Sequence, residues 1–231
     1  MLRYLTSGES HGQSLISIID GLPSNVELNF DEINAELKKR QCGYGRGGRM
    51  KIESDKVNIL GGVRGKKTLG GPVSIEVKNR DYQNWTEYMA PMDDVDFETR
   101  KVDNVRPGHA DLVGCLKYDF TDARNVLERS SARETASRVA VGAICKQVLK
   151  NFDIDFVSHV IQIGNVKDEN IYDFDYIKNN VDNSEVRCAN KDMEAKMISQ
   201  IDEIKNERDT IGGVVEVRVK NLIPGLGSYT Q

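Results

Sequence analysis

The amino-acid sequence predicts an α+β fold, with antiparallel strands and amphipathic helices in one domain that covers residues 1–231. Short segments of alternating or β-branched residues recur through the first third of the chain and predict strands. Glycine-rich turns join several of them, which favours antiparallel pairing. Two longer segments, 132–150 and 191–208, place apolar residues three and four positions apart, as helices with one buried face do. A chain of 231 residues with 39% hydrophobic composition can bury a sizeable core.

The first two strands are expected at 2–6 and 15–19, so a connection between strands carries His11. A helix follows, because Asn29 can cap its start, with Glu32 three residues on, and Gly43 can end it. Three further strands, arranged as an antiparallel meander and separated by turn residues, are expected at 50–53, 57–60 and 73–77.

Residues 79–105 are polar and show no period, which makes this segment a candidate lid. The remaining expected elements are helices at 109–118, 132–150 and 191–208, and strands at 153–166 and 214–219.

Charge is distributed unevenly along the chain, although the net charge is only -4. Residues 38–51 hold six basic residues and no acidic one, whereas residues 153–209 hold fourteen acidic and seven basic residues. The negative total argues against general nucleic-acid binding. No segment has the apolar length of a membrane span and the N-terminus has no targeting pattern, so a soluble cytoplasmic protein is expected. The cysteines are too widely spaced to predict a metal site or a disulfide framework.

Two of the three histidines stand in glycine-containing loops. His11 lies between Ser10 and Gly12, and an imidazole there can serve as a general acid near neutral pH. The alternative is a loop histidine bound to a backbone carbonyl. His109 follows a Pro-Gly pair at a helix start, where an anion is favoured, and its alternative is a structural role at that helix end. His159 is expected to be a core or edge residue.

Arginines gather near these loops. The glycine-rich segment 43–49 carries Arg46 and Arg49, and its alternative reading is a basic hairpin tip that touches RNA. The segment 128–136 combines arginines with serines that can cap a helix, so Arg129 and Arg133 share a face if the helix extends back one turn. Its alternative is an ordinary capped helix with paired arginines. Arg106 directly precedes the second histidine loop.

Four strings together resemble the chorismate synthase family, and they occur in that family's order: Gly-Glu-Ser-His-Gly at 8–12, Gly-Arg-Gly-Gly-Arg-Met at 45–50, Arg-Pro-Gly-His-Ala-Asp at 106–111, and Glu-Arg-Ser-Ser-Ala-Arg-Glu-Thr-Ala at 128–136. The resemblance implies a lyase that removes phosphate from 5-enolpyruvylshikimate 3-phosphate by 1,4-elimination to give chorismate. Reduced FMN is the implied cofactor, and NADPH is its implied reductant in some members.

The resemblance also implies roles for individual residues. His11 would protonate or hydrogen-bond the departing phosphate, oriented by Ser10 or by an inward-facing Glu9, and His109 would act near the flavin. FMN would contact Arg129, Ser130 and Ser131, and the NADPH nucleotide is associated with Arg40 and Arg46. The substrate would be bound by Ser10, Arg40, Arg46, Arg49, Arg106 and Arg133.

The implied fold places helices between antiparallel sheets, and the implied assembly is a homotetramer. Chains of this family continue beyond Gln231, so we expect a chain truncated before its C-terminal segment and impaired in FMN binding and turnover. The alternative functions are an inactive homologue that acts only in subunit interaction, and a protein that binds anions or nucleic acid.

Overall fold

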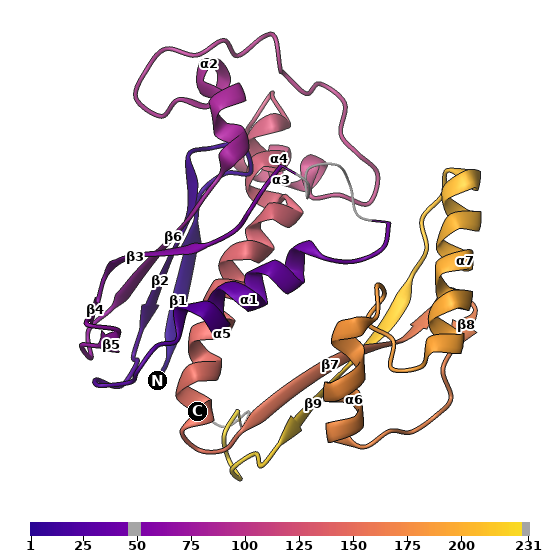
Figure 1. Cartoon of the computed structure of the whole chain (residues 1–231). Coiled ribbons are helices and arrows are strands. Elements are labelled where there is room, and N and C mark those ends of the chain that lie inside the picture. Colours follow the sequence, from indigo (N-terminus) through magenta and orange to yellow (C-terminus); the bar gives the residue numbers. More distant parts are fainter. Residues whose placement is uncertain (46–51, 228–231) are drawn as a thin grey trace. The chain divides into compact units, whose positions relative to one another are not determined.

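The computed structural model describes residues 1–45 and 52–227, which form two compact units (Figure 1). One unit holds the described residues of Met1–Arg40 and Gly48–Cys145, and the other holds those of Gln41–Gly47 and Lys146–Gln231. Both units combine helices with antiparallel strands, so the predicted α+β class is confirmed. A single domain over residues 1–231 stays a prediction.

The first unit is built on a four-stranded antiparallel sheet in the order β1-β2-β6-β3. Its strands are β1 (Arg3–Ser7), β2 (Ser14–Asp20), β3 (Val57–Gly61) and β6 (Val73–Lys78). The antiparallel neighbours expected at 57–60 and 73–77 are confirmed, since β3 pairs with β6, and β6 also pairs with β2 on its other side. Three residues of β6 are buried in alternation, which suits a central strand, whereas β3 has no fully buried residue and takes the edge.

Of the strand expected at 50–53, residues 50 and 51 lie outside the described residues, and residues 52 and 53 are not part of a strand. Glu53 and Asp55 are buried there and their carboxylates meet arginines, so the segment serves ion pairing instead of strand pairing. A two-stranded hairpin, β4 (Val63–Arg64) with β5 (Lys67–Thr68), separates β3 from β6.

Helix α1 (Phe30–Gln41) begins at the predicted cap. The Asn29 side-chain oxygen accepts the backbone N–H groups of Asp31 and Glu32 at 3.1 and 3.2 Å, and its amide donates to the Glu32 carboxylate at 3.2 Å. This reciprocal arrangement satisfies donors that the first turn leaves unpaired. Ile33 and Leu37 are fully buried, as their spacing predicts.

Helix α5 (Thr135–Lys150) follows the short helix η3 (Ala132–Glu134), and Figure 1 shows α1 and α5 on the same side of the sheet. The buried face of α5 is rich in alanine, and small side chains permit a close approach to neighbouring backbone. The largest part of this core comes from residues that point to one side of each element, namely Leu15, Ile19, Val73, Ile75, Val77, Ile33, Leu37, Ala136, Ala140 and Ile144.

Four more helices of this unit are η2 (Arg80–Asn84), α2 (Thr86–Met89), α3 (Asp111–Tyr118) and α4 (Arg124–Ser130). The segment 79–105 was expected to lack regular structure, but η2 and α2 form its first part. Trp85 is buried between them, at 8% exposure. Helix α4 was not expected, and it follows α3 through a short turn at Asp119, which adopts a left-handed conformation.

The second unit has a three-stranded antiparallel sheet in the order β8-β7-β9. Its elements are β7 (Asp155–Ile163), β8 (Val166–Lys167), α6 (Phe174–Asn180), η4 (Val181–Asn183), α7 (Lys191–Glu207) and β9 (Gly213–Lys220). Val157 packs against Ile177 and Val181, and Met197 of α7 is fully buried in a second cluster. His159 is 4% exposed within β7, which confirms a core position.

Asn190 caps α7 by accepting the backbone N–H of Asp192 at 2.9 Å. The charged helix therefore begins at Lys191, as expected. Among the described residues, no helix combines the length and the apolar character that crossing a bilayer requires.

Candidate active site

The connection between β1 and β2 presents His11 and is fixed at both ends by backbone contacts. Gly8 has φ +99°, and a side chain there would overlap the backbone of Ser14, so this position requires glycine. The Ser10 N–H donates to the Glu128 carbonyl at 2.9 Å, and the Gly12 N–H donates to the Glu9 carbonyl at 3.2 Å. The loop is therefore a defined turn tied to α4.

A buried carboxylate holds the His11 ring. Nδ1 of His11 lies 2.8 and 3.0 Å from the two carboxylate oxygens of Glu128, and the backbone N–H of His11 donates to the same group at 2.8 Å. The Glu128 side chain is 1% exposed, and Arg124 pairs with it at 3.0 Å. Glu9, which was expected to orient His11 if it faced inward, is exposed instead.

Two opposing effects set the pKa of Glu128. Burial raises this pKa, but the hydrogen bonds from His11 and Arg124 outweigh the burial and leave the pKa below its usual value. Glu128 is therefore an ionised acceptor at neutral pH.

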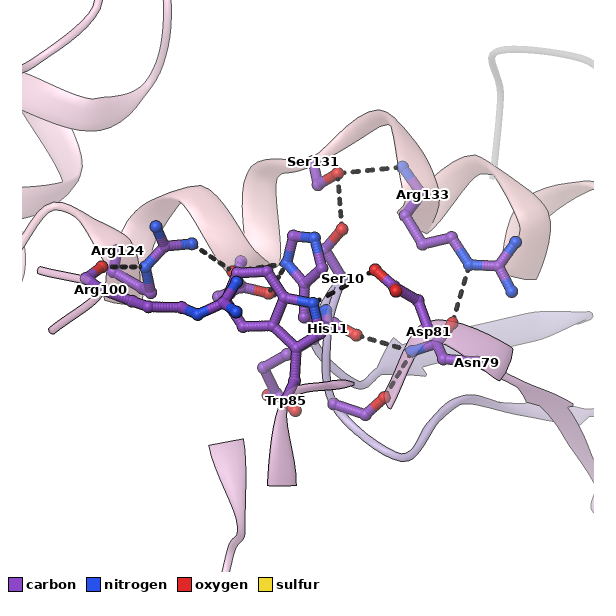
Figure 2. A network of polar contacts seen from close by, with 12 residues as sticks. Ser10, His11, Asn79, Asp81, Trp85, Arg100, Arg124, Ser131 and Arg133 are labelled. Carbon is purple, nitrogen blue, oxygen red and sulfur yellow. Dashed lines mark hydrogen bonds and ion pairs between the residues drawn. The ribbon is translucent and has the colours of Figure 1, made fainter. Parts of the chain in front are cut away.

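Aromatic and cationic groups cover one face of the imidazole. The rings of His11 and Trp85 are stacked, with centroids 3.9 Å apart and an interplanar angle of 25° (Figure 2). The Arg100 guanidinium lies 3.9 Å from the Trp85 ring centroid and 4.5 Å from that of Tyr88. The Trp85 indole N–H donates to Asp81 at 3.2 Å. The segment 79–105 thus supplies one wall of the His11 environment.

A second set of hydrogen bonds joins the histidine loop to residues 131–133, as Figure 2 shows. The Ser10 hydroxyl donates to the Ser131 hydroxyl at 3.0 Å. The Asn79 amide donates to the carbonyls of Glu9 and Gly12 at 3.1 and 2.7 Å, and Asn79 in turn accepts from Arg133 at 2.8 Å. These contacts bring together three distant segments of the sequence.

Asp55 is the shared partner of two predicted anion-binding arginines. Arg133 Nη1 lies 2.6 Å and Arg40 Nη1 3.3 Å from its carboxylate, and the three side chains are 4%, 8% and 0% exposed in the order Arg133, Arg40, Asp55. Arg40 also donates to the Thr135 hydroxyl at 2.8 Å. Both guanidinium groups lie inside the protein here, so their contact with substrate stays a prediction. The burial of Arg40 also weakens the idea of a basic surface patch that starts at Lys38.

Arg129 and Ser130 are exposed at the end of α4. Arg129 Nη2 donates to the carbonyl and the hydroxyl of Thr6 at 2.8 and 2.6 Å, while the side chain keeps 42% exposure. The Ser130 hydroxyl donates to the Val126 carbonyl at 2.7 Å. Ser131 is extended and ends α4, so the helix does not run on from Arg129 to Arg133 and the condition for a shared helix face is not met. Only Ser131 of the two serines caps the next helix, accepting the Arg133 N–H.

The second histidine loop forms a cluster around Asp111, the first residue of α3. Arg106 Nε donates to the Asp111 carboxylate at 2.9 Å, His109 Nδ1 contacts the same carboxylate, and Arg106 Nη2 lies 3.0 Å from His109 Nδ1. Hydrogen bonds from Arg106 hold the pKa of Asp111 far below its usual range. Arg106 and His109 remain 48% and 28% exposed. Gly108 has φ +71° and open space where a side chain would point.

The contacts link six predicted site residues around the first loop, which are Ser10, His11, Arg40, Arg129, Ser131 and Arg133. Ser130 lies on the same helix end, and Arg106 and His109 form the second cluster. That both histidines face one ligand stays a prediction. Arg46 and Arg49 lie outside the described residues.

Sequence reasoning missed the supporting roles of four residues. They are Asp55, Asn79, Trp85 and Glu128, the last through its contact with His11. Glu128 and His11 are separated by 117 positions, and no local sequence pattern predicts a contact over such a distance. Trp85 offered a signal, because it is the one tryptophan of the sequence and stands in an otherwise polar segment.

Comparison with known proteins decides the relationship. The profile of the family described as chorismate synthase matches residues 2–231. This chain belongs to the chorismate synthase family. The solved structure titled "Crystal Structure of Chorismate Synthase" is similar at a TM-score of 0.76 with 39% identity, over 100% of this chain and 61% of that chain.

Curated relatives agree with this placement in the chorismate synthase family. A chorismate synthase of Alkaliphilus metalliredigens (strain QYMF) is 53% identical over 232 residues, and one of Staphylococcus aureus (strain Newman) is 52% identical over 234 residues. Each match covers all of this chain and 60% of the relative, so the chain spans about three fifths of the length of these proteins.

Proposed function

We propose that this chain carries out the chorismate synthase reaction, the 1,4-elimination of phosphate from 5-enolpyruvylshikimate 3-phosphate, with reduced FMN. Family membership supports the reaction class. One observation carries the assignment to residues, namely the way in which the protein holds the His11 side chain. Its Nδ1 faces a buried, ionised carboxylate, while the residue sits in a loop with glycine on one side and a partly exposed ring. Such a group can give a hydrogen bond or a proton to an anion that leaves.

His11 acts on the departing phosphate through Nε2. Phosphate gains negative charge as its bond to the ring carbon breaks, and a fixed donor at that oxygen lowers the barrier because its interaction strengthens as charge develops. Glu128 stabilises the positive charge of the imidazolium, as a carboxylate does in other histidine-carboxylate pairs. Ser10, Arg40, Arg46, Arg49, Arg106 and Arg133 are the proposed substrate contacts, of which Arg106 is partly exposed in the described structure.

The end of α4 fits the flavin. Arg129 presents an exposed guanidinium that Thr6 and Gly8 hold in place, and Ser130 is the next residue and is also exposed, so this helix end suits a phosphate-bearing ligand. We assign FMN to Arg129, Ser130 and Ser131, with His109 as the acid-base group near the flavin. When bound, reduced FMN supplies electron density to the ring from which phosphate departs.

The residues are less suited to NADPH. Arg40 is 8% exposed and bound to Asp55, Thr135 and the Ala132 carbonyl, so it does not fit a nucleotide site in this arrangement. We therefore derive no step from NADPH. A homotetramer in the cytoplasm completes the proposal, and it rests on the family resemblance alone.

The test mixes the purified chain with dithionite-reduced FMN and 5-enolpyruvylshikimate 3-phosphate under anaerobic conditions. Inorganic phosphate and the absorbance of chorismate are followed together. We expect equal amounts of both products, formed slowly and only with reduced flavin, and a strongly lower rate for His11→Ala and for His109→Ala. Phosphate release without chorismate, or wild-type rates in both variants, would contradict the assignment.

A further inference from the structure

We propose that Glu128 and Trp85 are positioning residues that fix the tautomer and the plane of the His11 imidazole, so that Nε2 is the nitrogen presented to the substrate. This inference deepens the proposed function and rests on it for its catalytic meaning, but the geometry it predicts can be measured without turnover.

Glu128 fixes the tautomer because an ionised carboxylate can only accept hydrogen bonds. Both of its oxygens lie within 3.0 Å of His11 Nδ1, so that nitrogen must carry a proton for the contact to be favourable. The backbone N–H of His11 and the guanidinium of Arg124 occupy the same carboxylate at 2.8 and 3.0 Å. In a neutral imidazole the proton on Nδ1 leaves Nε2 as the acceptor, and in the imidazolium Nε2 becomes a donor.

The same carboxylate also fixes the position of the loop. The Glu128 carboxylate accepts hydrogen bonds from both the side chain and the backbone of His11, which prevents the ring from rotating independently of the main chain. The Ser10 N–H adds a bond to the Glu128 carbonyl at 2.9 Å. Three hydrogen bonds therefore join Ser10 and His11 to Glu128, so the position of the imidazole is set by α4.

Trp85 fixes the plane of the ring. The stack at 3.9 Å between centroids covers one face of His11, and Trp85 is itself held by its bond to Asp81 and by the Arg100 guanidinium over its ring. A cation over an indole is attracted to the electron-rich face of the ring, which resists displacement of Trp85. Tilting the imidazole would require movement of this whole stack, so the ring is held at its edge by Glu128 and at its face by Trp85.

Nitrogen-15 NMR of the histidine rings tests the tautomer directly. The chain has only three histidines, and His11→Gln assigns the signal of interest. At alkaline pH, where imidazole is neutral, we expect His11 to be the Nδ1–H tautomer in the wild type. Glu128→Gln should shift it toward a mixture with the Nε2–H tautomer, because an amide can donate as well as accept. An Nε2–H tautomer in the wild type, or unchanged nitrogen shifts in Glu128→Gln, would overturn the role of Glu128.

A matched control is available in the second unit, where Glu216 lies 2.7 Å from Nε2 of His159. Glu216→Gln should alter the His159 signals and leave those of His11 unchanged. A change at His11 in this variant would show that the effect of Glu128→Gln is not local, and would count against the proposal.

Ring-proton shifts test the stack. The carbon-bound protons of His11 should lie upfield in the wild type and in Trp85→Phe, and move toward unstacked values in Trp85→Leu while the tautomer stays the same. Equal shifts in Trp85→Leu and the wild type would contradict the role of Trp85.

Turnover then separates this inference from the proposed function. Glu128→Gln and Trp85→Leu should lower kcat more than tenfold with little change in KM, and Glu128→Asp should recover part of the loss. An inactive wild type with the predicted tautomer and stack would refute the proposed reaction and leave the geometry of His11 intact. Full activity in both variants, despite altered His11 signals, would refute the positioning role.

Discussion

Replacing Asp55 by asparagine should destabilise the first unit by about 3–5 kcal/mol, the range for removing one partner of a buried ion pair. The Asp55 side chain has no exposed surface and pairs with Arg133 at 2.6 Å and Arg40 at 3.3 Å. An asparagine leaves both guanidinium groups buried at 4% and 8% exposure without its charge. Glu53 remains 3.8 Å from Arg133 and compensates only in part.

The expected loss is a large share of the roughly 5–15 kcal/mol by which proteins are stable. It corresponds to about 10 °C in Tm for a chain of this length. Circular dichroism during thermal and urea unfolding measures both. The control is Asp103→Asn in the same unit, since Asp103 is 70% exposed and pairs with Lys101 at 3.4 Å. An exposed pair contributes at most about 1 kcal/mol. Equal losses in the two variants would refute the argument that the Asp55 cluster holds the site together.

Two further predictions concern packing and pH. Gly114→Ala places a methyl group against Val126 between α3 and α4 and should lower the free energy of unfolding by about 1–3 kcal/mol. Gly142→Ala, on an open face of α5, should raise the free energy of unfolding by up to about 1 kcal/mol. Urea unfolding of both variants checks this, and destabilisation by Gly142→Ala would contradict it. Asp111 has a depressed pKa, so its contribution is fully present above its unfolded value of 3.8 and is lost as pH falls. The stability gap between wild type and Asp111→Asn should therefore be constant near neutrality and shrink below about pH 4; a gap that widens in acid would contradict the assignment.

Local signals predicted most of the elements because each depends on neighbouring residues. The cap at Asn29 and the apolar stripe of Ile33 and Leu37 located α1, and alternation located β6 and β9. Strand order was not predictable in this way, since the position of β6 beside β2 depends on pairing between distant segments. The described half of the strand expected at 50–53 is not extended into a sheet, because the buried Glu53 carboxylate pairs with Arg133 instead.

The candidate site shows the same division. Motifs made His11, Arg129 and Ser131 candidates, because glycine, histidine and arginine in short loops favour anion chemistry without tertiary information. The partners that hold these groups, Glu128 and Asp55, are defined only by the fold. Sequence reasoning assigned the buried Arg133 to substrate, which stays a prediction, whereas its described contacts are with Asp55, Asn79 and other protein groups.

The most direct measurement for the central claim is a titration of the chain, in the presence of oxidised FMN, with 5-enolpyruvylshikimate 3-phosphate, observed through the histidine ring nitrogens. If one ligand site is lined by both motif histidines, the His11 and His109 signals shift at the same ligand concentrations while those of His159 do not. Signals of His11 and His109 that stay unchanged at saturating substrate, or that respond with different affinities, would contradict a shared site.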